Sequence, residues 1–414
     1  MISIEREELK SALDRLCKVA SAKADAGPSH ELKFKTKKGG IVVQATNDIK
    51  TLNVRYAFSG SSCDCDEEVE FCIPGIPLSQ AVSLLVGDNV TFTQSGRSVL
   101  IGTDRGGDEQ EHSLMGMSPK HWTGRPVFDD DRASFDVPRP ILCGVGRYEG
   151  FSCHADIALA PITAVFLRVR PDGTLEATST DQARMSFLDI PMTCRSVTIN
   201  PPNDSAPAST APPSKVKRDT EGFTFMLPTT AASVMPSLFG PECDWIAVKA
   251  NENRATFSHG PLTFDIDNER NVENYPTIRE RKIGEPAFSW IVDVAELRRI
   301  VNLVATIAMR TLCKIEFDRS GKVVISGVGG VEKGSKSKQT IKPIEVDGDL
   351  FADSENIIEV SCADLVEALS VPTADKVAIG LSNPAGAATG SLFVIEQTNE
   401  PKWRHVMLRS TEAV

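Results

Sequence analysis

Residues 174–192, TLEATSTDQARMSFLDIPM, carry the pattern that decides the fold. Small or apolar residues alternate with polar ones up to Thr180, and an apolar pattern resumes at Met185 after a polar break. Alternation with a period of two predicts two strands joined by a turn. A similar hairpin lies earlier, in residues 41–58, IVVQATNDIKTLNVRYAF. The acidic turns at Asp48 and Asp181 are 133 residues apart, which indicates a repeat the size of a domain.

The length and the composition of the chain favour a globular protein of several domains. The chain has 414 residues, of which 41% are hydrophobic and 24% are charged, a length typical of two to four domains. It contains no apolar run near the roughly 18 residues that a membrane helix needs. The first residues, MISIEREELK, do not resemble a signal peptide. We therefore expect a soluble, cytoplasmic protein without a membrane partner.

The net charge of −11 argues against a protein that coats nucleic acid with its whole surface. It leaves room for a local basic face. The ten cysteines are scattered, and without an export signal they are expected to stay reduced. Cys63 and Cys65, with Cys72 nearby, lack a second ligand pair at zinc-type spacing, so we expect no metal site and no cofactor.

Catalytic motifs are missing from the sequence. It has no GxxxxGK[ST] loop, no GxSxG elbow, and no HxH or HExxH spacing among its six histidines. Cys153 and His154 are adjacent, but neighbouring residues on a strand face opposite ways. We predict that the chain is not an enzyme. A β-rich enzyme using Cys153 or His154 is the alternative.

The order of expected elements repeats three times. Each copy begins with a strand and a helix, continues with strands, and then runs through strand, helix and strands again. The predicted fold class is α+β, with three tandem domains at 1–128, 129–284 and 285–414. Two stretches interrupt the pattern: 196–222, rich in proline, serine and alanine, predicted to be a mobile loop, and 327–342, rich in glycine and lysine, predicted to be an exposed loop.

The first helices of the copies carry basic outer faces. In residues 5–20, Leu9, Leu13 and Leu16 recur at helical spacing while Lys10 and Lys18 lie opposite. In residues 293–307, arginines lie opposite the apolar stripe in the same way. Such faces contact phosphates or are ordinary solvated surfaces, and the pattern alone leaves both interpretations open.

This arrangement resembles the bacterial DNA polymerase III β sliding clamp family. TSTDQARMSFLDIPM is similar to the family's threonine-aspartate-glycine-histidine-arginine-leucine hairpin, although Gln182 and Ala183 stand where the family has glycine and histidine. YPTIR at 275–279 resembles the aromatic-proline motif that closes the second domain. QSGRS at 94–98 and HADI at 154–157 resemble two further segments. The resemblance covers the whole chain in order.

The resemblance implies a ring-shaped processivity factor: a head-to-tail homodimer of six domains that encircles duplex DNA without reading its sequence. A loader would open it, and DNA polymerases would bind it through short peptide motifs. It implies three clamp domains, each of two helix-plus-sheet halves, forming half of the ring. Basic residues would face the DNA in the bore, where phosphate contacts allow sliding. The candidates are Lys10, Arg15, Lys18, Lys23, Arg139, Arg147, His154, Arg298 and Arg299.

The family's partner pocket takes an apolar peptide between the second and third domains. Thr180, Arg184 and Met185 match the hairpin's threonine, arginine and leucine. The full candidate set is Thr180, Gln182, Arg184, Met185, Pro161, Pro276, Arg281, Val406, Met407 and Leu408. Burial of apolar anchors supplies affinity in such pockets, and a few polar groups orient the peptide. Plain core packing is the alternative for Met185 and 406–408. The alternative function is a clamp-like scaffold or decoy that binds such peptides without encircling DNA.

Overall fold

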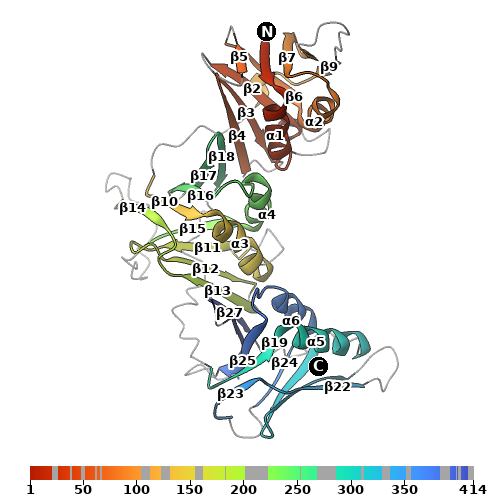
Figure 1. Cartoon of the computed structure of the whole chain (residues 1–414), viewed down its shortest axis with the longest axis vertical. Helices are drawn as coiled ribbons and strands as arrows, with labels where there is room; N and C mark the ends of the chain where they lie inside the picture. The colour runs from red at the N-terminus through yellow and green to blue at the C-terminus, as the bar shows by residue number, and fades with distance from the viewer. Residues whose placement is uncertain are drawn as a thin grey trace, which may run out of the picture. The chain divides into compact units, whose positions relative to one another are not determined.

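A computed structural model of the chain describes most of its residues (Figure 1). The described residues are 1–20, 27–37, 40–47, 52–60, 63–65, 68–103, 112–122, 131–153, 162–181, 183–200, 222–251, 253–267, 286–308, 312–328, 336–350, 356–382, 392–397, 399 and 402–408.

The same order of elements occurs three times among these residues. Each copy has a first half of one strand, one helix and four strands, and a second half of one strand, one helix and three strands. The first copy comprises β1 (Ile2–Glu5), α1 (Arg6–Leu16), β2 (Glu31–Lys37), β3 (Gly40–Thr46), β4 (Leu52–Ser59) and β5 (Cys63–Cys65), then β6 (Glu70–Pro74), α2 (Gly75–Leu84), β7 (Asn89–Ser95), β8 (Ser98–Thr103) and β9 (His112–Met115).

The second and third copies follow the same plan. The second comprises β10 (Ala133–Pro138), α3 (Arg139–Glu149), β11 (Ala164–Val169), β12 (Leu175–Thr180), β13 (Arg184–Ile190) and β14 (Arg195–Ile199), then β15 (Phe223–Pro228), α4 (Thr229–Leu238), β16 (Trp245–Ala250), β17 (Arg254–His259) and β18 (Leu262–Asp267). The third comprises β19 (Phe288–Asp293), α5 (Val294–Ala308), β20 (Leu312–Asp318), β21 (Lys322–Val328), β22 (Lys336–Ile341) and β23 (Glu345–Gly348), then β24 (Ile357–Ser361), α6 (Cys362–Leu369), β25 (Lys376–Ser382), β26 (Leu392–Gln397) and β27 (Lys402–Met407). Short 3₁₀ turns lie at Gly27–His30, Pro119–His121 and Gly150–Ser152.

Apolar periodicity builds each half. In α1, Leu9, Leu13 and Leu16 are fully buried, as their spacing predicts for one face of a helix. β1 and β10 alternate buried and partly exposed residues, which is typical of a strand with one face against the core. Aromatic residues fill the interior. Phe34 and Phe71 stack with ring centroids 4.9 Å apart, and Phe288 meets Phe317 edge to face at 4.8 Å.

The contacts divide the chain into two compact units, and each unit holds one large and one small antiparallel sheet. Residues 1–141, 194–225 and 230–270 form the first unit, and the remainder forms the second. The first contains the sheets β5-β1-β7-β8-β9 and β14-β10-β16-β17-β18-β4-β3-β2-β6. The second contains β15-β11-β12-β13-β27-β26-β25-β19-β23 and β22-β21-β20-β24. The middle copy is therefore shared between the units.

Two strand pairings join successive copies. β4 of the first copy pairs with β18 of the second, with Phe264 opposite Val54. β13 of the second copy pairs with β27 of the third, with Met185 opposite Val406 (Figure 1). The predicted boundaries near 128 and 284 are thus crossed by continuous backbone hydrogen bonding. The division into three domains at those positions stays a prediction.

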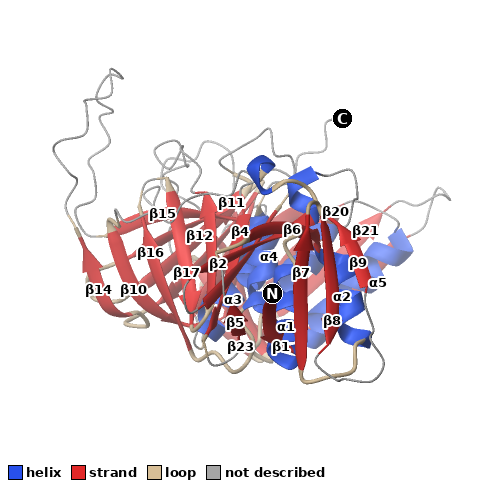
Figure 2. Ribbon diagram, turned by 90° about the horizontal axis from the view of Figure 1, so that it is seen from above, coloured by secondary structure: helices blue, strands red, loops and turns tan. Residues whose placement is uncertain are grey.

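Both predicted loops contain strands, and the prediction was wrong at these places. Residues 195–199, at the start of the expected mobile loop, form β14, which pairs with β10 at the edge of its sheet (Figure 2). The expected loop at 327–342 contains the end of β21 and the whole of β22. Both strands lie at sheet edges, where many side chains stay exposed and apolar alternation is not required. Residues 201–221 lie outside the described part of the chain.

Candidate functional site

The predicted peptide pocket centres on the turn between β12 and β13. The Asp181 carboxylate accepts hydrogen bonds from the backbone N–H groups of Ala183 and Arg184, at 3.0 and 2.9 Å. The Thr180 hydroxyl donates to the Arg184 carbonyl at 2.9 Å. Short polar side chains that bond nearby backbone groups stabilise tight turns. The Thr-Asp pair therefore fixes the direction in which Arg184 and Met185 leave the turn.

β27 completes this surface beside β13. Arg184 lies opposite Met407 and Met185 lies opposite Val406, while the Leu408 N–H donates to the Ala183 carbonyl at 3.0 Å. Six predicted pocket residues thus come together: Thr180, Arg184, Met185, Val406, Met407 and Leu408. The other four, Pro161, Gln182, Pro276 and Arg281, lie outside the described residues.

Five of the six residues divide into those that are buried and those that face solvent, and Arg184 is described below. Thr180, Val406 and Met407 are at most 3% exposed, so they form the floor and core of the site. Met185 is half-buried and Leu408 is 49% exposed. Of these five residues, Met185 and Leu408 therefore contribute the apolar area offered to solvent, while Val406 and Met407 are buried, and the part of all of them in a peptide pocket stays a prediction.

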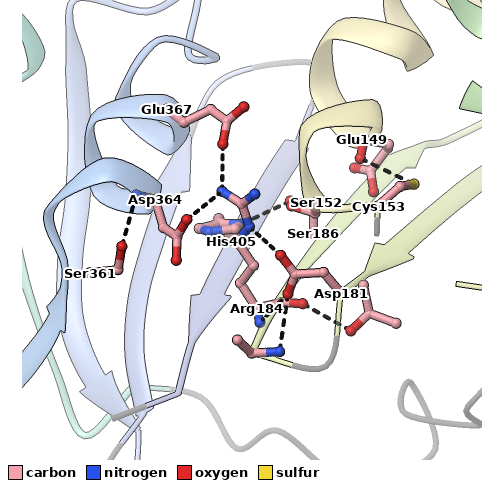
Figure 3. A network of polar contacts seen from close by, with 12 residues as sticks. Glu149, Ser152, Cys153, Asp181, Arg184, Ser186, Ser361, Asp364, Glu367 and His405 are labelled. Atoms are coloured by element: carbon pink, nitrogen blue, oxygen red, sulfur yellow. Dashed lines mark hydrogen bonds and ion pairs between the residues drawn. The ribbon is translucent and has the colours of Figure 1, made fainter. Parts of the chain in front are cut away.

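Arg184 is held by carboxylates from two elements (Figure 3). Its Nε donates to Asp181 Oδ2 at 2.7 Å, and one terminal nitrogen donates to Glu367 Oε2 at 2.7 Å. The same terminal nitrogen lies 3.3 Å from Asp364 Oδ1. Burial lowers the pKa of Arg184, but its bonds to Glu367 and Asp181 and the charge of Asp364 raise that pKa above its ordinary value overall. The guanidinium is therefore bonded to carboxylates of α6 and of the turn that precedes β13.

A buried polar network lies beneath the turn (Figure 3). His405 is fully buried, and its Nδ1 shares a 2.8 Å hydrogen bond with the Ser186 hydroxyl, which also contacts the Ser152 hydroxyl at 2.8 Å. The Trp403 ring stacks on the His405 ring at 5.7 Å. Burial, helped by the nearby Arg184 charge, lowers the pKa of His405 to about 3. His405 is therefore a neutral structural residue at ordinary pH.

Glu149 and Cys153 lie in the same region. Ser179 donates a 2.9 Å hydrogen bond to the fully buried carboxylate of Glu149. Burial, together with the charge of Glu149, raises the pKa of the Cys153 thiol well above its ordinary range. Such a thiol stays protonated and is not an activated nucleophile. This argues against the enzyme alternative at Cys153, and His154 lies outside the described residues.

The predicted DNA-facing residues fall into two groups. Lys10, Lys18, Arg147 and Arg299 are exposed on α1, the segment after it, α3 and α5. Arg15, Arg139 and Arg298 are half-buried and contact the ends of second-half helices or the segments after them. Arg15 pairs with Glu242 at 2.5 Å, Arg139 donates to the Phe239 carbonyl at 2.7 Å, and Arg298 donates to the Leu369 carbonyl.

Cations near the carbonyl end of a helix complement its dipole, which gives Arg139 and Arg298 a structural role that the sequence did not indicate. Lys23 and His154 lie outside the described residues.

Within the described residues, no group of three or more His, Cys, Asp or Glu side chains is placed to hold a metal ion. Among those same residues, no helix combines the length and apolar character needed to span a bilayer.

Sequence comparison finds no relative: no protein-family model matches the chain, and no curated protein matches it. Structural comparison finds many. The sliding clamp of Bacillus subtilis DNA polymerase is 15% identical, with a TM-score of 0.78 over 99% of this chain and 98% of that chain. The β chain of DNA polymerase III from Streptococcus pneumoniae is 14% identical, with a TM-score of 0.79 over 99% of each chain.

The Helicobacter pylori β clamp bound to a DNA ligase peptide is 16% identical, with a TM-score of 0.74 over 99% of this chain and all of that chain. Identity at this level says nothing about individual residues, but coverage is nearly complete in each comparison. Over its whole length, the chain therefore has the fold of the bacterial DNA polymerase III β sliding clamps.

Proposed function

We propose that the chain is a DNA polymerase processivity factor: two copies associate head to tail into a ring around duplex DNA, and the ring tethers polymerases, a clamp loader and other partners by short peptides. It would act in the cytoplasm, on the nucleoid, and perform no chemistry of its own. The clamp fold supports this proposal. The observation that carries it concerns the edge strands β9 and β22. They occupy the same places in the repeat as strands that pair with each other inside the chain.

The threefold repeat of elements shows which strands are equivalent to these two edge strands. β4, β13 and β22 are each the third strand after the first helix of a copy, and β18, β27 and β9 are each the third strand after the second helix. Inside the chain, β4 pairs with β18 and β13 pairs with β27. β22 and β9 remain, and each ends its sheet among the described strands. An open edge invites pairing with another chain, so β22 of one copy would pair with β9 of a second. Two copies then use all four edges.

Exposed apolar side chains lie in the two half-copies that carry these edges. Leu84 at the end of α2, Val86 just after it and Met115 on β9 are exposed; so are Ile307 at the end of α5, Ile344 just before β23 and Val346 on β23. At the internal junctions, the corresponding contacts are polar. Arg15 on α1 pairs with Glu242 after α4, and Arg147 on α3 reaches the Ser370 carbonyl after α6 at 3.5 Å. Exposed apolar side chains in the parts of a chain that carry unpaired strand edges are typical of an interface between chains.

The peptide-docking part of the proposal rests on the surface around Met185, Leu408 and Arg184. A solved structure with the same fold, the Helicobacter pylori β clamp, binds a DNA ligase peptide. The DNA part rests on the exposed cations Lys10, Lys18, Arg147 and Arg299.

Retention on circular DNA tests the ring. Chains dissociated by dilution are allowed to reassociate in the presence of nicked circular DNA, and the mixture is then passed over a sizing column in moderate salt. We expect a particle with the mass of two chains to elute with the circle, and to be released when a restriction enzyme linearises it. A protein that stays monomeric, or is retained equally on linear DNA, would contradict the proposal.

The scaffold or decoy alternative has one observation in its favour. The exposed helix faces also carry Glu7 and Asp14 on α1 and Glu296 on α5, so their charge is mixed. Reversing Arg147 and Arg299 to glutamate separates the two functions. In a clamp, DNA retention falls while a matched reversal of the strand residues Lys322 and Lys376 has little effect; in a scaffold, peptide binding survives and no DNA retention is present to lose.

A further inference from the structure

We propose that Glu31 is a positioning residue for the interface between copies: its carboxylate holds the chain just after β9, so that β9 is ordered for pairing with β22 of a second copy before the two meet. The inference rests on the proposed function, because it concerns what fixes one of the two strand edges that would form the ring.

The packing of β9 itself does little to hold this strand. It has four residues, of which His112, Ser113 and Met115 are exposed and Leu114 is half-buried. Among the described strands it pairs with β8 alone. Its equivalents are held on both sides, since β18 lies between β17 and β4, and β27 lies between β26 and β13. A short strand with one neighbour and exposed side chains opens easily, so a further anchor is required to keep β9 in one conformation.

The anchor lies directly after β9. The Met117 N–H donates to both carboxylate oxygens of Glu31, at 2.9 and 2.7 Å. Gly116 is bonded to Arg97 twice, since its N–H donates to the Arg97 carbonyl and its carbonyl accepts from Arg97 Nε, each at 3.0 Å. Glu31 begins β2, and Arg97 lies in the turn between β7 and β8. Both sheets of the first compact unit therefore hold this segment.

Gly116 also lies directly against β6. A Cβ at this position would overlap the carbonyl oxygen of Cys72, so the backbone can pass here only without a side chain. Met115, the last residue of β9, is thus followed by a residue in contact with β6 and by a residue bonded to Glu31. The end of β9 is fixed in position although its own side chains are mostly exposed.

A carboxylate is present at this place in the first copy and not in the other two. β11 and β20 are the equivalents of β2, and they begin with Ala164 and Leu312. Residues 162–166, ITAVF, and 310–314, RTLCK, contain neither Asp nor Glu. Glu31 is 9% exposed, and burial of a carboxylate costs free energy that burial of an apolar residue does not. The carboxylate therefore coincides with the copy in which the strand equivalent to β18 and β27 has an open edge.

Order before association strengthens association. A strand that already has its bound conformation loses less conformational entropy when it pairs, so the complex is tighter. Without the Glu31 contact, β9 would have to be ordered as the dimer forms. The dissociation constant of the dimer should therefore depend on Glu31, although its side chain is buried within one copy.

Analytical ultracentrifugation of full-length variants tests this role. We expect Glu31→Ala to raise the dimer dissociation constant at least about 10-fold, because a hydrogen bond to a charged group is lost at each of two junctions. Glu31→Gln keeps one oxygen that can accept the Met117 N–H, and it should recover much of the affinity. Hydrogen–deuterium exchange in residues 112–117, measured below the dissociation constant, should be faster in Glu31→Ala than in the unaltered protein.

Glu176→Ala is the matched control. Glu176, on β12, is 6% exposed and accepts a 2.8 Å hydrogen bond from Arg170, and its sheet carries neither open edge. Its replacement should lower the free energy of unfolding while the dissociation constant and the exchange in residues 112–117 stay unchanged. Urea unfolding of each variant measures the stability that it has lost.

The outcomes separate this inference from the proposed function. An unchanged dissociation constant in Glu31→Ala overturns the inference and leaves the ring intact. An equal rise in Glu176→Ala also overturns it, because the effect would then follow from a general loss of stability. Exchange at residues 116–117 of the unaltered monomer as fast as in an unfolded peptide overturns it without any variant. If the unaltered protein forms no dimer, the proposed function fails, and the inference fails with it.

Discussion

His405 is a fully buried imidazole with its pKa lowered to about 3 by burial and by the charge of Arg184. The unfolded chain would bind a proton near the ordinary histidine pKa of about 6.5. Its contribution to stability is therefore complete above that value and is lost progressively as the pH falls from about 6.5 towards 3. We expect the free energy of unfolding of the native protein to fall by up to about 1.4 kcal/mol per pH unit more than that of His405→Gln over this range.

Urea unfolding at a series of pH values measures both slopes. Parallel slopes for the native protein and His405→Gln would show that His405 is not a buried neutral group. The pH dependence that the two proteins share would come from other groups, such as Asp265, whose pKa is raised mainly by burial.

The sequence predicted which residues come together at the turn between β12 and β13 better than it predicted their contacts. Thr180, Arg184 and Met185 were identified from the hairpin pattern, because turn chemistry and strand alternation are local signals. The partners of Arg184 were missed, since Glu367 lies 183 residues away in the chain. Burial of His405 and Glu149 was missed for the same reason: nothing nearby in the sequence shows that a charged or titratable side chain will be covered.

At the scale of single elements, α6 depends on its first turn. Ser361 accepts the Asp364 N–H at 3.3 Å, and α6 has only eight residues, so one cap serves a large share of the helix. We expect Ser361→Ala to lower the free energy of unfolding by about 1 kcal/mol. Ser361→Thr keeps a capping hydroxyl and should lose much less. Chemical unfolding of the three proteins measures this, and equal stability of the alanine and threonine variants would contradict it.

Strands with a clear apolar alternation were predicted well, and edge strands were not. The hairpins predicted at 174–192 and 41–58 are present as β12–β13 and β3–β4, with outer ends that differ from the prediction by at most two residues. β14 and β22 were predicted as loops because their residues are mostly polar or exposed. Among the described strands each has one neighbour, and backbone hydrogen bonding to that neighbour holds it without an apolar face.

At the scale of the whole molecule, the proposed dimer makes exposed apolar residues of the half-copies that carry β9 and β22, such as Leu84 and Ile307, into interface residues. Burial of a leucine or isoleucine contributes about 1.5–3 kcal/mol. A closed ring of two copies contains the junction twice, so each substitution acts twice. We expect Leu84→Asp or Ile307→Asp to raise the dimer dissociation constant by at least about 100-fold, measured by analytical ultracentrifugation.

Met192→Asp is the matched control for these variants. Met192 is 74% exposed, but it follows β13, whose edge is already paired with β27. Its replacement should leave the dissociation constant unchanged. Weakening by Met192→Asp to the same extent as by Leu84→Asp would show that Leu84 and Ile307 have no special role in the dimer.

The pairings β4–β18 and β13–β27 also decide which pieces of this polypeptide can be made on their own. Cutting at the predicted boundaries near 128 or 284 severs one peptide bond, yet it strips a whole neighbouring strand from each side of the cut. The truncated protein would expose strands whose backbone N–H and C=O groups have lost their hydrogen-bond partners. Such edges pair with other copies of the protein, so the truncated protein would tend to precipitate. The three copies repeat one plan without being separable parts, and the two compact units are not separable by a cut either, because the chain passes from one unit to the other several times within the middle copy.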